Sequence, residues 1–302
     1  MSRNTYTILG LLAILFWSTT FGFSRLLIEK LGIITATTSV YFISGLFSCA
    51  IIYSRKANRK RFLEINRKYL FICGTLFVFY AITVYLSVGL VYTRQQVIEV
   101  GLLNYLWPSL TIIFSIIFLK YNARPWVILG LILATGGVFL AGLQGTEISI
   151  SKTFTNIFSN WYAYLLALSA AVSWGLFSNF SRLWGSKSSA DGMPVFILST
   201  GLILIIVRLF VVEESFWDAE SIGSLIYMSI FPTFLGYQFW DKAMQKGDMI
   251  LVASFSYFTP VLATIFSCIY LDLNCGWMLW IGCGLVLAGS IISKLSVKKS
   301  AD

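Results

Sequence analysis

Apolar residues fill ten long stretches of this chain, and most polar residues collect between them. Each stretch is 18–24 residues long, close to the roughly 20 residues that a helix needs to cross a bilayer. Few show the amphipathic pattern of a soluble surface helix. The pattern therefore predicts an all-α membrane protein with ten transmembrane helices, at residues 5–27, 35–53, 69–90, 96–118, 126–143, 161–184, 194–212, 221–242, 249–270 and 276–295.

The overall composition agrees with a membrane protein. The 302 residues are 58% hydrophobic and 12% charged, whereas soluble domains carry about 25% charged residues. The first stretch follows Arg3 as a signal peptide would, but it is too long for a signal core and no A-x-A cleavage site follows it. We therefore interpret it as a membrane span.

The basic residues predict how the spans are oriented. If the N-terminus is cytoplasmic, 17 of the 22 Lys and Arg residues fall on the cytoplasmic side and 5 on the other. Cytoplasmic loops normally carry the excess of Lys and Arg, so both termini are expected in the cytoplasm. The net charge of +9 is then a topology signal, and nucleic acid is not an expected partner. The basic run RKANRKR (55–61) either only sets orientation or also touches anionic lipid headgroups.

The chain also resembles itself. AILFWSTTFGFSR (13–25) matches AAVSWGLFSNFSR (170–182) at an offset of 157, and YLWPSLTIIFS (105–115) matches YFTPVLATIFS (257–267) at an offset of 152. A pair of glycines seven residues apart recurs at the same offset of 152, as Gly130 and Gly137 and then as Gly282 and Gly289. Three matches in one order indicate an internal repeat.

Each half of this repeat holds five spans. Because five is odd, the second half must enter the membrane from the opposite side. Inverted repeats of this kind are common in secondary transporters, whose solute site lies near the membrane midplane. We expect a first five-helix repeat at 1–145, an extracytoplasmic linker at 146–160 and a second, inverted repeat at 161–302.

Two prolines occupy matching places in the two halves, since Pro108 and Pro260 lie near the middle of the fourth and ninth spans. Proline interrupts a helix, and interrupted membrane helices are tolerated where they pack on protein or line a watery cavity. A kink that only shapes the bundle remains an alternative, but the symmetry favours cavity lining. The glycine pairs predict that one face of the fifth span and one face of the tenth span are small, which allows close helix packing.

Several aromatic residues lie deep inside predicted spans instead of at their ends. Trp17, Trp107 and Trp174 are about 11–13 residues into their spans, roughly 16–20 Å deep at 1.5 Å per residue. A buried indole N–H needs a hydrogen-bond partner, and polar side chains nearby are the expected ones. With intramembrane tyrosines, these residues predict an aromatic cavity for a neutral or zwitterionic solute.

The sequence carries no sign of cofactor or metal chemistry. It has no histidine, its five cysteines form no C-x-x-C pair, and no nucleotide-binding motif is present. No cluster of catalytic groups is visible, so we do not expect an enzyme. Charged residues in membrane spans are functional candidates, and those for gating or coupling are Arg25, Glu99, Arg182 and Asp241. Proton-coupled and passive transport both remain open.

The repeat and its two prolines resemble the drug/metabolite transporter superfamily, with its paired EamA-type repeats. Within it, WSTTFGFSR (17–25), VIEVGLLNYLWPSLTIIFSIIF (97–118) and SYFTPVLATIFS (256–267) resemble the YddG-type aromatic amino acid exporters of bacterial inner membranes. The resemblance implies export of aromatic amino acids, with related amphipathic metabolites as further candidates, by alternating access. By position, the substrate-binding residues it implies are Trp17, Tyr80, Asn104, Tyr105, Trp107, Pro108, Trp174, Ser256, Tyr257 and Pro260.

Some features leave alternatives open. Thr259 stands where the first half has Trp107, so the two cavity walls should differ. The first span has no acidic residue before Glu29, which argues against the proton-coupled cation efflux of small multidrug members. The same fold would also suit threonine or homoserine, a purine or nucleoside-like metabolite, or a hydrophobic drug, and a receptor role is a further alternative. We expect a monomer or homodimer in the lipid bilayer that acts on a small molecule.

Overall fold

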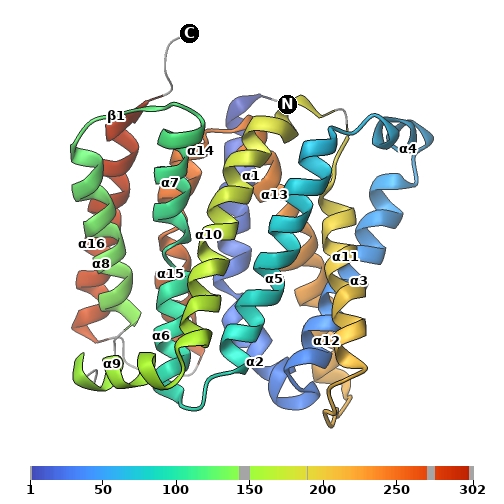
Figure 1. Cartoon of the computed structure of the whole chain (residues 1–302), viewed down its shortest axis with the longest axis horizontal. Helices are drawn as coiled ribbons and strands as arrows, with labels where there is room; N and C mark the ends of the chain where they lie inside the picture. Colours follow the sequence, from blue (N-terminus) through green and yellow to red (C-terminus); the bar gives the residue numbers. More distant parts are fainter. Residues whose placement is uncertain (1, 143–149, 189, 271–275, 299–302) are drawn as a thin grey trace. The chain divides into compact units, whose positions relative to one another are not determined.

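A computed structural model describes residues 2–142, 150–188, 190–270 and 276–298 of the chain, which are mostly helical (Figure 1). In chain order the elements are α1 (Arg3–Ser18), α2 (Thr20–Leu31), α3 (Ile33–Tyr53), α4 (Lys56–Leu63), the π-helix η1 (Tyr69–Cys73), α5 (Gly74–Gly89), α6 (Arg94–Asn104), α7 (Trp107–Phe118), β1 (Asn122–Ala123), α8 (Trp126–Gly142), α9 (Ile150–Ser159), α10 (Trp161–Trp184), the 3₁₀ turn η2 (Gly185–Lys187), α11 (Met193–Arg208), α12 (Ala219–Met228), the π-helix η3 (Ser229–Gly236), α13 (Tyr237–Lys246), α14 (Met249–Phe255), α15 (Phe258–Tyr270), α16 (Trp277–Ser296) and β2 (Val297–Lys298).

Many of these helices are long and apolar enough to enter a membrane. Within the described residues, five helical segments have the length and composition to cross it, at Ile33–Tyr53, Tyr69–Gly89, Glu99–Phe118, Trp161–Lys187 and Trp277–Ser296. Shorter apolar helices lie at Trp126–Ala141, Met193–Arg208 and Met249–Ala263. The protein is therefore a helical membrane protein, and the crossing of all ten predicted segments stays a prediction.

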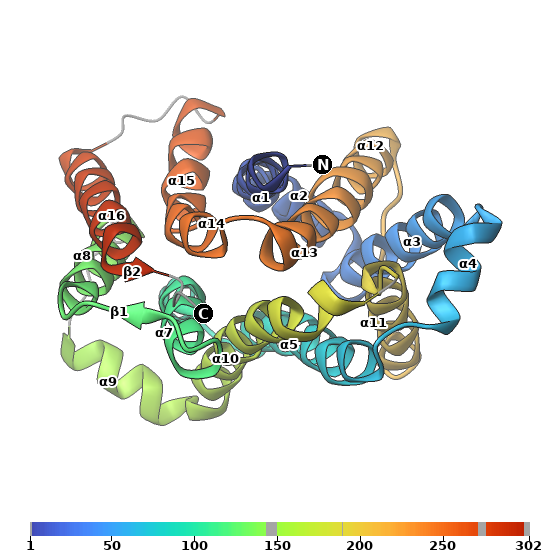
Figure 2. The same ribbon diagram turned by 90° about the horizontal axis from the view of Figure 1, so that it is seen from above.

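The helices form two compact units, and each unit takes segments from both halves of the sequence. Unit 1 comprises Met1–Ile82 and Phe180–Gly247, and unit 2 comprises Thr83–Asn179 and Asp248–Asp302. Helices far apart in sequence therefore pack as neighbours within a unit. In unit 1, α3 lies beside α11 (Figure 2).

A carboxylate from a distant loop caps α3 in unit 1. Gly32 at the N-cap has no side chain to accept the free N–H groups, and the carboxylate of Glu213 accepts them instead, from Ile34 at 2.9 Å and Thr35 at 2.8 Å. Burial pushes the pKa of Glu213 upward, but these backbone hydrogen bonds and nearby Arg208 outweigh it and hold the pKa below its ordinary value. The cap joins the start of α3 to the segment after α11.

In unit 2, α8 and α16 run side by side (Figures 1 and 2). The matched glycines lie in this contact, because a Cβ on Gly137 would sit 2.6 Å from the carbonyl oxygen of Gly282, and a Cβ on Gly289 would sit 2.4 Å from the amide nitrogen of Ala134. The small glycine face of each helix does allow close helix packing, and the helix packed on it is the other member of the repeat pair. A short antiparallel ribbon, β1 with β2, joins the start of α8 to the end of α16.

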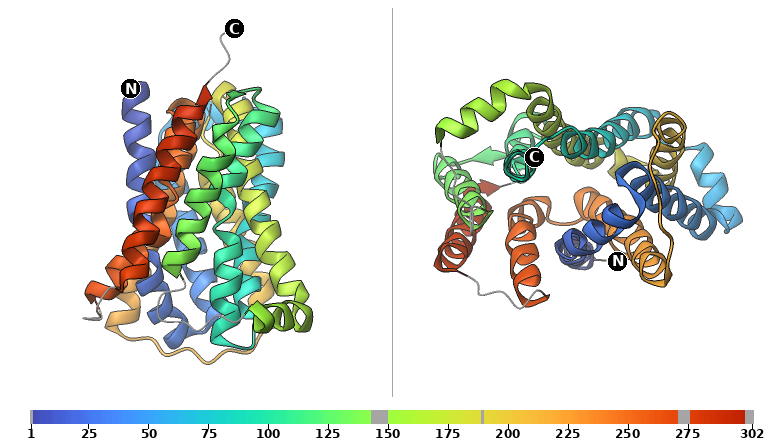
Figure 3. Two further views of the ribbon diagram at one scale, coloured as in Figure 1. Left: turned by 90° about the vertical axis from the view of Figure 1, so that its left-hand side faces the viewer. Right: turned by 90° about the horizontal axis from the view of Figure 1, so that it is seen from below.

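Several elements differ from a set of straight spans. The first predicted span is interrupted at Thr19, between α1 and α2, and the eighth passes through η3, which contains Pro232. The predicted linker contains a helix, α9, which lies across the ends of its neighbours in unit 2 (Figures 1 and 3). Hydrophobic run length carries no information on these local changes.

Candidate functional site

The stretch around Pro108 is a helix break. Helix α6 ends at Asn104, a turn occupies Tyr105 and Leu106, and α7 begins at Trp107. Pro108 is the second residue of α7, where the missing N–H has no helical partner to lose and the fixed φ suits the first turn. The proline therefore begins a second helix instead of bending a continuous one.

A matching break lies in the second half of the chain. Helix α14 ends at Phe255, a turn occupies Ser256 and Tyr257, and α15 begins at Phe258, with Pro260 in its first turn. At the repeat offset of 152, this turn falls within one residue of the first, which is the usual uncertainty of a helix end. The sequence repeat thus corresponds to a structural one.

The two breaks are tied together within unit 2. The hydroxyl of Tyr257 is hydrogen-bonded to the hydroxyl of Ser109, which directly follows Pro108. Ser109 is also hydrogen-bonded to the hydroxyl of Thr135 on α8, at 2.9 Å. Tyr257 is fully buried, so this small polar network fixes the starts of α7 and α15 against each other inside apolar surroundings.

Two of the predicted tryptophans meet beside the first break. The rings of Trp107 and Trp174 contact edge to face, with centroids 6.1 Å apart and an interplanar angle of 80°. Such a pair contributes about 0.5–1.5 kcal/mol beyond its buried area. Both side chains are largely buried, Trp107 being 5% exposed and Trp174 2%. They form a buried aromatic corner between α7 and α10.

Buried polar atoms that have no hydrogen-bond partner among the described residues lie at both breaks. Within the part of the chain that the structure describes, Asn104 Oδ1 and Thr259 Oγ1 are buried and make no hydrogen bond. Most buried polar atoms in proteins do have a partner. Asn104 ends α6, and Thr259 occupies the repeat position of Trp107, so one such atom is present at each break.

Trp17, in unit 1, has a different partner from the polar side chains that we expected. Its indole N–H donates to the carbonyl of Pro232 at 3.0 Å, inside the π-helix η3. Gly236 leaves room for this approach, because a Cβ there would lie 2.7 Å from Trp17 Nε1. The Trp17 ring also packs on Trp240 and Tyr237, with centroids 5.3 and 5.6 Å away. The expectation of a side-chain partner for Trp17 is wrong because the π-helix presents this carbonyl, and the sequence does not indicate a π-helix.

The ten predicted substrate-binding residues are divided between the units. Trp17 and the half-buried Tyr80 belong to unit 1, and the other eight belong to unit 2. Sequence reasoning did not single out Pro232 or Trp240. The available signal for Pro232 was its place inside the predicted eighth span, at residues 221–242.

Asp241 is the centre of a polar network in unit 1. Its side chain is fully buried, and its carboxylate accepts hydrogen bonds from the hydroxyl of Tyr69 at 2.7 Å, from the amide of Gln245 at 2.8 Å and from the hydroxyl of Ser181. The donors come from η1, α13 and the end of α10. This carboxylate therefore holds three elements together through neutral donors.

Arg182 is next to this network. Its guanidinium donates to the carbonyls of Met244, Gln245 and Gly247 at 2.9–3.1 Å. These carbonyls belong to the end of α13, where a cation also complements the helix dipole. Arg182 thus fastens the end of α10 to the end of α13. Its repeat partner Arg25 lies in α2, and its side chain is outside the described part.

Glu99 forms the corresponding network in unit 2. It is 7% exposed, the hydroxyl of Tyr164 donates to it, and the amide of Asn156 lies 3.3 Å from each of its oxygens. Glu99 thereby joins α6 to α9 and α10. Of the four charged candidates, Arg182 and Asp241 lie at one junction and Glu99 lies in the other unit.

A family model described as the EamA-like transporter family matches residues 4–143 and again 161–295. The chain belongs to the EamA-like transporter family. This EamA-like protein is 31% identical over 301 residues to the aromatic amino acid exporter YddG of Escherichia coli, covering 99% of this chain and 100% of the relative. It is 29% identical, with the same coverage, to the exporter of that name from Salmonella typhimurium. The similarity to YddG-type exporters therefore extends over the full length of the chain.

More distant matches agree on the fold. YddG of Ancylobacter novellus is 25% identical over 304 residues, which cover 99% of this chain and 100% of the relative. A crystal structure of a protein 22% identical in sequence superposes with a TM-score of 0.82, over 97% of this chain and 99% of that one. Together with the apolar helices, family membership makes this EamA-like chain a multi-pass protein of the inner membrane.

Proposed function

We propose that this protein is an exporter with ten transmembrane helices and both termini in the cytoplasm. Residues 1–145 and 161–302 form two inverted five-helix repeats, joined by an extracytoplasmic linker at 146–160. Three facts support this arrangement: the odd number of predicted spans in each half, the 17-to-5 distribution of basic residues, and the two separate matches to the family model.

The proposed substrates are aromatic amino acids, carried by alternating access. One observation carries the proposal: the paired helix breaks lie beside the Trp107–Trp174 corner, and each break has a buried polar atom without a partner among the described residues. An aromatic ring stacks on indoles, while the ammonium and carboxylate of an amino acid can hydrogen-bond to Asn104 and Thr259. The printed names of the YddG relatives point to the same substrates.

The proposal retains all ten residues that were predicted to bind the substrate. Because the N–H of Trp17 is engaged by Pro232, Trp17 contributes its ring only. Tyr257 orients the second break through Ser109. The proposed substrate-binding set remains Trp17, Tyr80, Asn104, Tyr105, Trp107, Pro108, Trp174, Ser256, Tyr257 and Pro260.

The charged candidates fit gating better than direct substrate contact. Asp241 and Arg182 hold one helix junction, and Glu99 holds another, so each network must loosen if its helices move. In the predicted topology the first junction is cytoplasmic and the second extracytoplasmic. We propose that the two networks stabilise closed ends of the transport path.

Counterflow in proteoliposomes tests the function. Labelled tryptophan, phenylalanine and threonine are offered separately, with and without a pH gradient, to the wild type and to Trp107→Phe, Asn104→Leu and Trp161→Phe. Phenylalanine is used at Trp107 because truncating a buried tryptophan to alanine costs about 3–5 kcal/mol and would confuse folding with function. Trp161 is 61% exposed and serves as the matched control.

The proposal expects flux of the aromatic pair, reduced in the Trp107 and Asn104 variants and normal in the Trp161 variant. A response to the pH gradient that is lost in Asp241→Asn would assign coupling to that carboxylate. Threonine flux alone, or equal flux in all variants, would contradict the aromatic substrate and the assigned site. The family would then stand, and the search would turn to other solutes of the superfamily, such as planar metabolites and hydrophobic drugs.

A further inference from the structure

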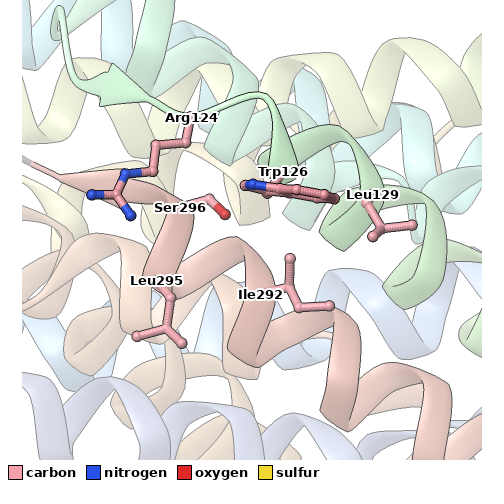
Figure 4. A pocket seen from close by; sticks show the side chains of 6 residues that line it. All are labelled: Arg124, Trp126, Leu129, Ile292, Leu295 and Ser296. Atoms are coloured by element: carbon pink, nitrogen blue, oxygen red, sulfur yellow. The ribbon is translucent and has the colours of Figure 1, made fainter.

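A groove lies on the surface of unit 2, where the start of α8 meets the end of α16 (Figure 4). Its volume is about 250 Å³. Figure 4 shows Arg124 at one end and Leu129 at the other. The lining residues are Arg124, Trp126, Leu129, Ile292, Leu295 and Ser296.

The backbone of the groove is held firmly. The ribbon of β1 and β2 pairs Asn122 with Lys298, and the N–H of Arg124 donates to the carbonyl of Ser296 at 2.9 Å. These bonds fix the loop that carries Arg124 against the last turn of α16. Replacing the Arg124 side chain would leave them in place.

The charge at the groove is unbalanced. Arg124 is exposed, and among the described residues it forms no ion pair and no acidic side chain lines the groove. The neighbouring Lys294 is different, because its ammonium pairs with Asp248 at 2.7 Å. Lys298, also exposed, adds a second positive charge on the ribbon. An anion is therefore the complementary ligand for Arg124.

The rest of the groove is apolar and faces outward. Trp126 and Leu295 are each 66% exposed, and Leu129 is 41% exposed. In an integral membrane protein such side chains meet lipid, and tryptophan prefers the level of the headgroups. A cation at headgroup level above an apolar channel matches a molecule with a phosphate at one end and a hydrocarbon chain at the other.

We propose that this groove binds one anionic phospholipid. The guanidinium of Arg124 holds the phosphate through paired N–H donors, the indole of Trp126 flanks the headgroup, and the first part of an acyl chain lies along Leu129, Ile292 and Leu295. The volume is below the roughly 300–1,000 Å³ of pockets that enclose drug-sized solutes, which fits part of a lipid. In the predicted topology the site faces the cytoplasmic leaflet, where anionic lipids attract basic residues.

Native mass spectrometry of the full chain, released from neutral detergent, tests the proposal. Phosphatidylglycerol and phosphatidylcholine are titrated separately onto the wild type and onto Arg124→Gln, Trp126→Ala and Arg59→Gln. Arg59 is an exposed arginine on the basic helix α4, so its variant removes the same charge without touching the groove. Size-exclusion profiles of each variant check folding.

We expect one phosphatidylglycerol to bind more tightly than the others and more tightly than phosphatidylcholine. Arg124→Gln should weaken this first binding about five-fold, the loss typical of one basic residue at a lipid surface, and Trp126→Ala should weaken it too. Equal weakening by Arg59→Gln would mean diffuse attraction and overturn the site. Equal affinity for phosphatidylcholine, or displacement of the lipid by millimolar inorganic phosphate, would also overturn it.

Discussion

The contact between α8 and α16 gives a sharp test of the packing, because on each helix a crowded glycine has an uncrowded glycine almost beside it. A Cβ on Gly137 would lie 2.6 Å from the carbonyl oxygen of Gly282, whereas a Cβ on Gly136 would meet nothing within 4 Å. On the partner helix, a Cβ on Gly282 would lie 2.7 Å from the carbonyl oxygen of Gly137, and one on Gly284 would again meet nothing within 4 Å.

The size of the effect follows from these distances. A methyl group needs about 3.5–4 Å from its neighbours, so alanine at Gly137 must push the helices about 1 Å apart or strain the backbone, at a typical overpacking cost of about 1–3 kcal/mol. Alanine also favours a helix over glycine by about 0.5–1 kcal/mol. This gain is the same at Gly136 and cancels in the comparison, so Gly137→Ala should be about 1–3 kcal/mol less stable than Gly136→Ala.

Thermal unfolding of the purified protein in detergent, followed by intrinsic tryptophan fluorescence, measures the difference. At about 2–4 °C per kcal/mol for chains approaching this length, the Gly137→Ala melting temperature should lie several degrees below that of Gly136→Ala. Gly282→Ala and Gly284→Ala should repeat the pattern. The double variant Gly137→Ala with Gly282→Ala should lose less than the sum of the two losses, because one separation of the helices relieves both clashes.

Equal melting temperatures for Gly136→Ala and Gly137→Ala would refute the reasoning, since they would mean that α8 and α16 are not in backbone contact there. If the melting temperatures of Gly136→Ala and Gly137→Ala both fell equally below that of the wild type, the cause would be a need for helix flexibility instead of a helix contact. The close contact is supported only if Gly137→Ala melts below Gly136→Ala and Gly282→Ala melts below Gly284→Ala.

Three further outcomes follow from the contacts in unit 1. Trp17→Phe keeps a smaller aromatic ring but leaves the Pro232 carbonyl without its indole donor, so the free energy of unfolding should fall by about 1–3 kcal/mol, measured by the same melts. Asp241→Ala leaves three buried donors without an acceptor and should lower the melting temperature strongly, whereas Asp241→Asn, whose amide can donate to the Ser181 hydroxyl, should lower it much less. The lowered pKa of Glu213 means that its stabilisation is present above the unfolded carboxyl pKa of about 4.3 and is lost as the pH falls through the lower folded value. Melts between pH 3 and 7 should therefore show a steeper acid loss in the wild type than in Glu213→Gln.

The features that sequence predicts here are those with a local physical cause. Bilayer thickness sets the length of an apolar run, so the helical stretches could be located from hydrophobicity alone. A proline has no N–H, so the break near Pro108 could be anticipated without knowing its neighbours. Glycines at a seven-residue interval keep one helix face small, so close packing could be expected of α8 and of α16, although only the structure shows that they pack on each other.

Other features depend on partners distant in sequence. Nothing near Gly32 indicates that α3 is capped by Glu213, which lies about 180 positions away and reaches the helix only once α11 has packed on α3. The partner of Trp17 is a backbone carbonyl that becomes available only in the π-helix around Pro232. The sequence predicts only a linker where α9 lies, because this short segment has no apolar run. Tertiary packing decides all three.

The repeat explains why the candidate site is asymmetric although its backbone is matched. Both halves supply a broken helix with a proline in the first turn of the second segment, so the scaffold is duplicated. The side chains differ, since Trp107 forms an aromatic corner with Trp174, while Thr259, at the equivalent position, offers a buried hydroxyl. An amino acid with an aromatic side chain has the same division between an apolar ring and polar backbone groups. Two identical walls would match only one part of such a solute, whereas a duplicated backbone with unlike side chains can match both and fix its orientation.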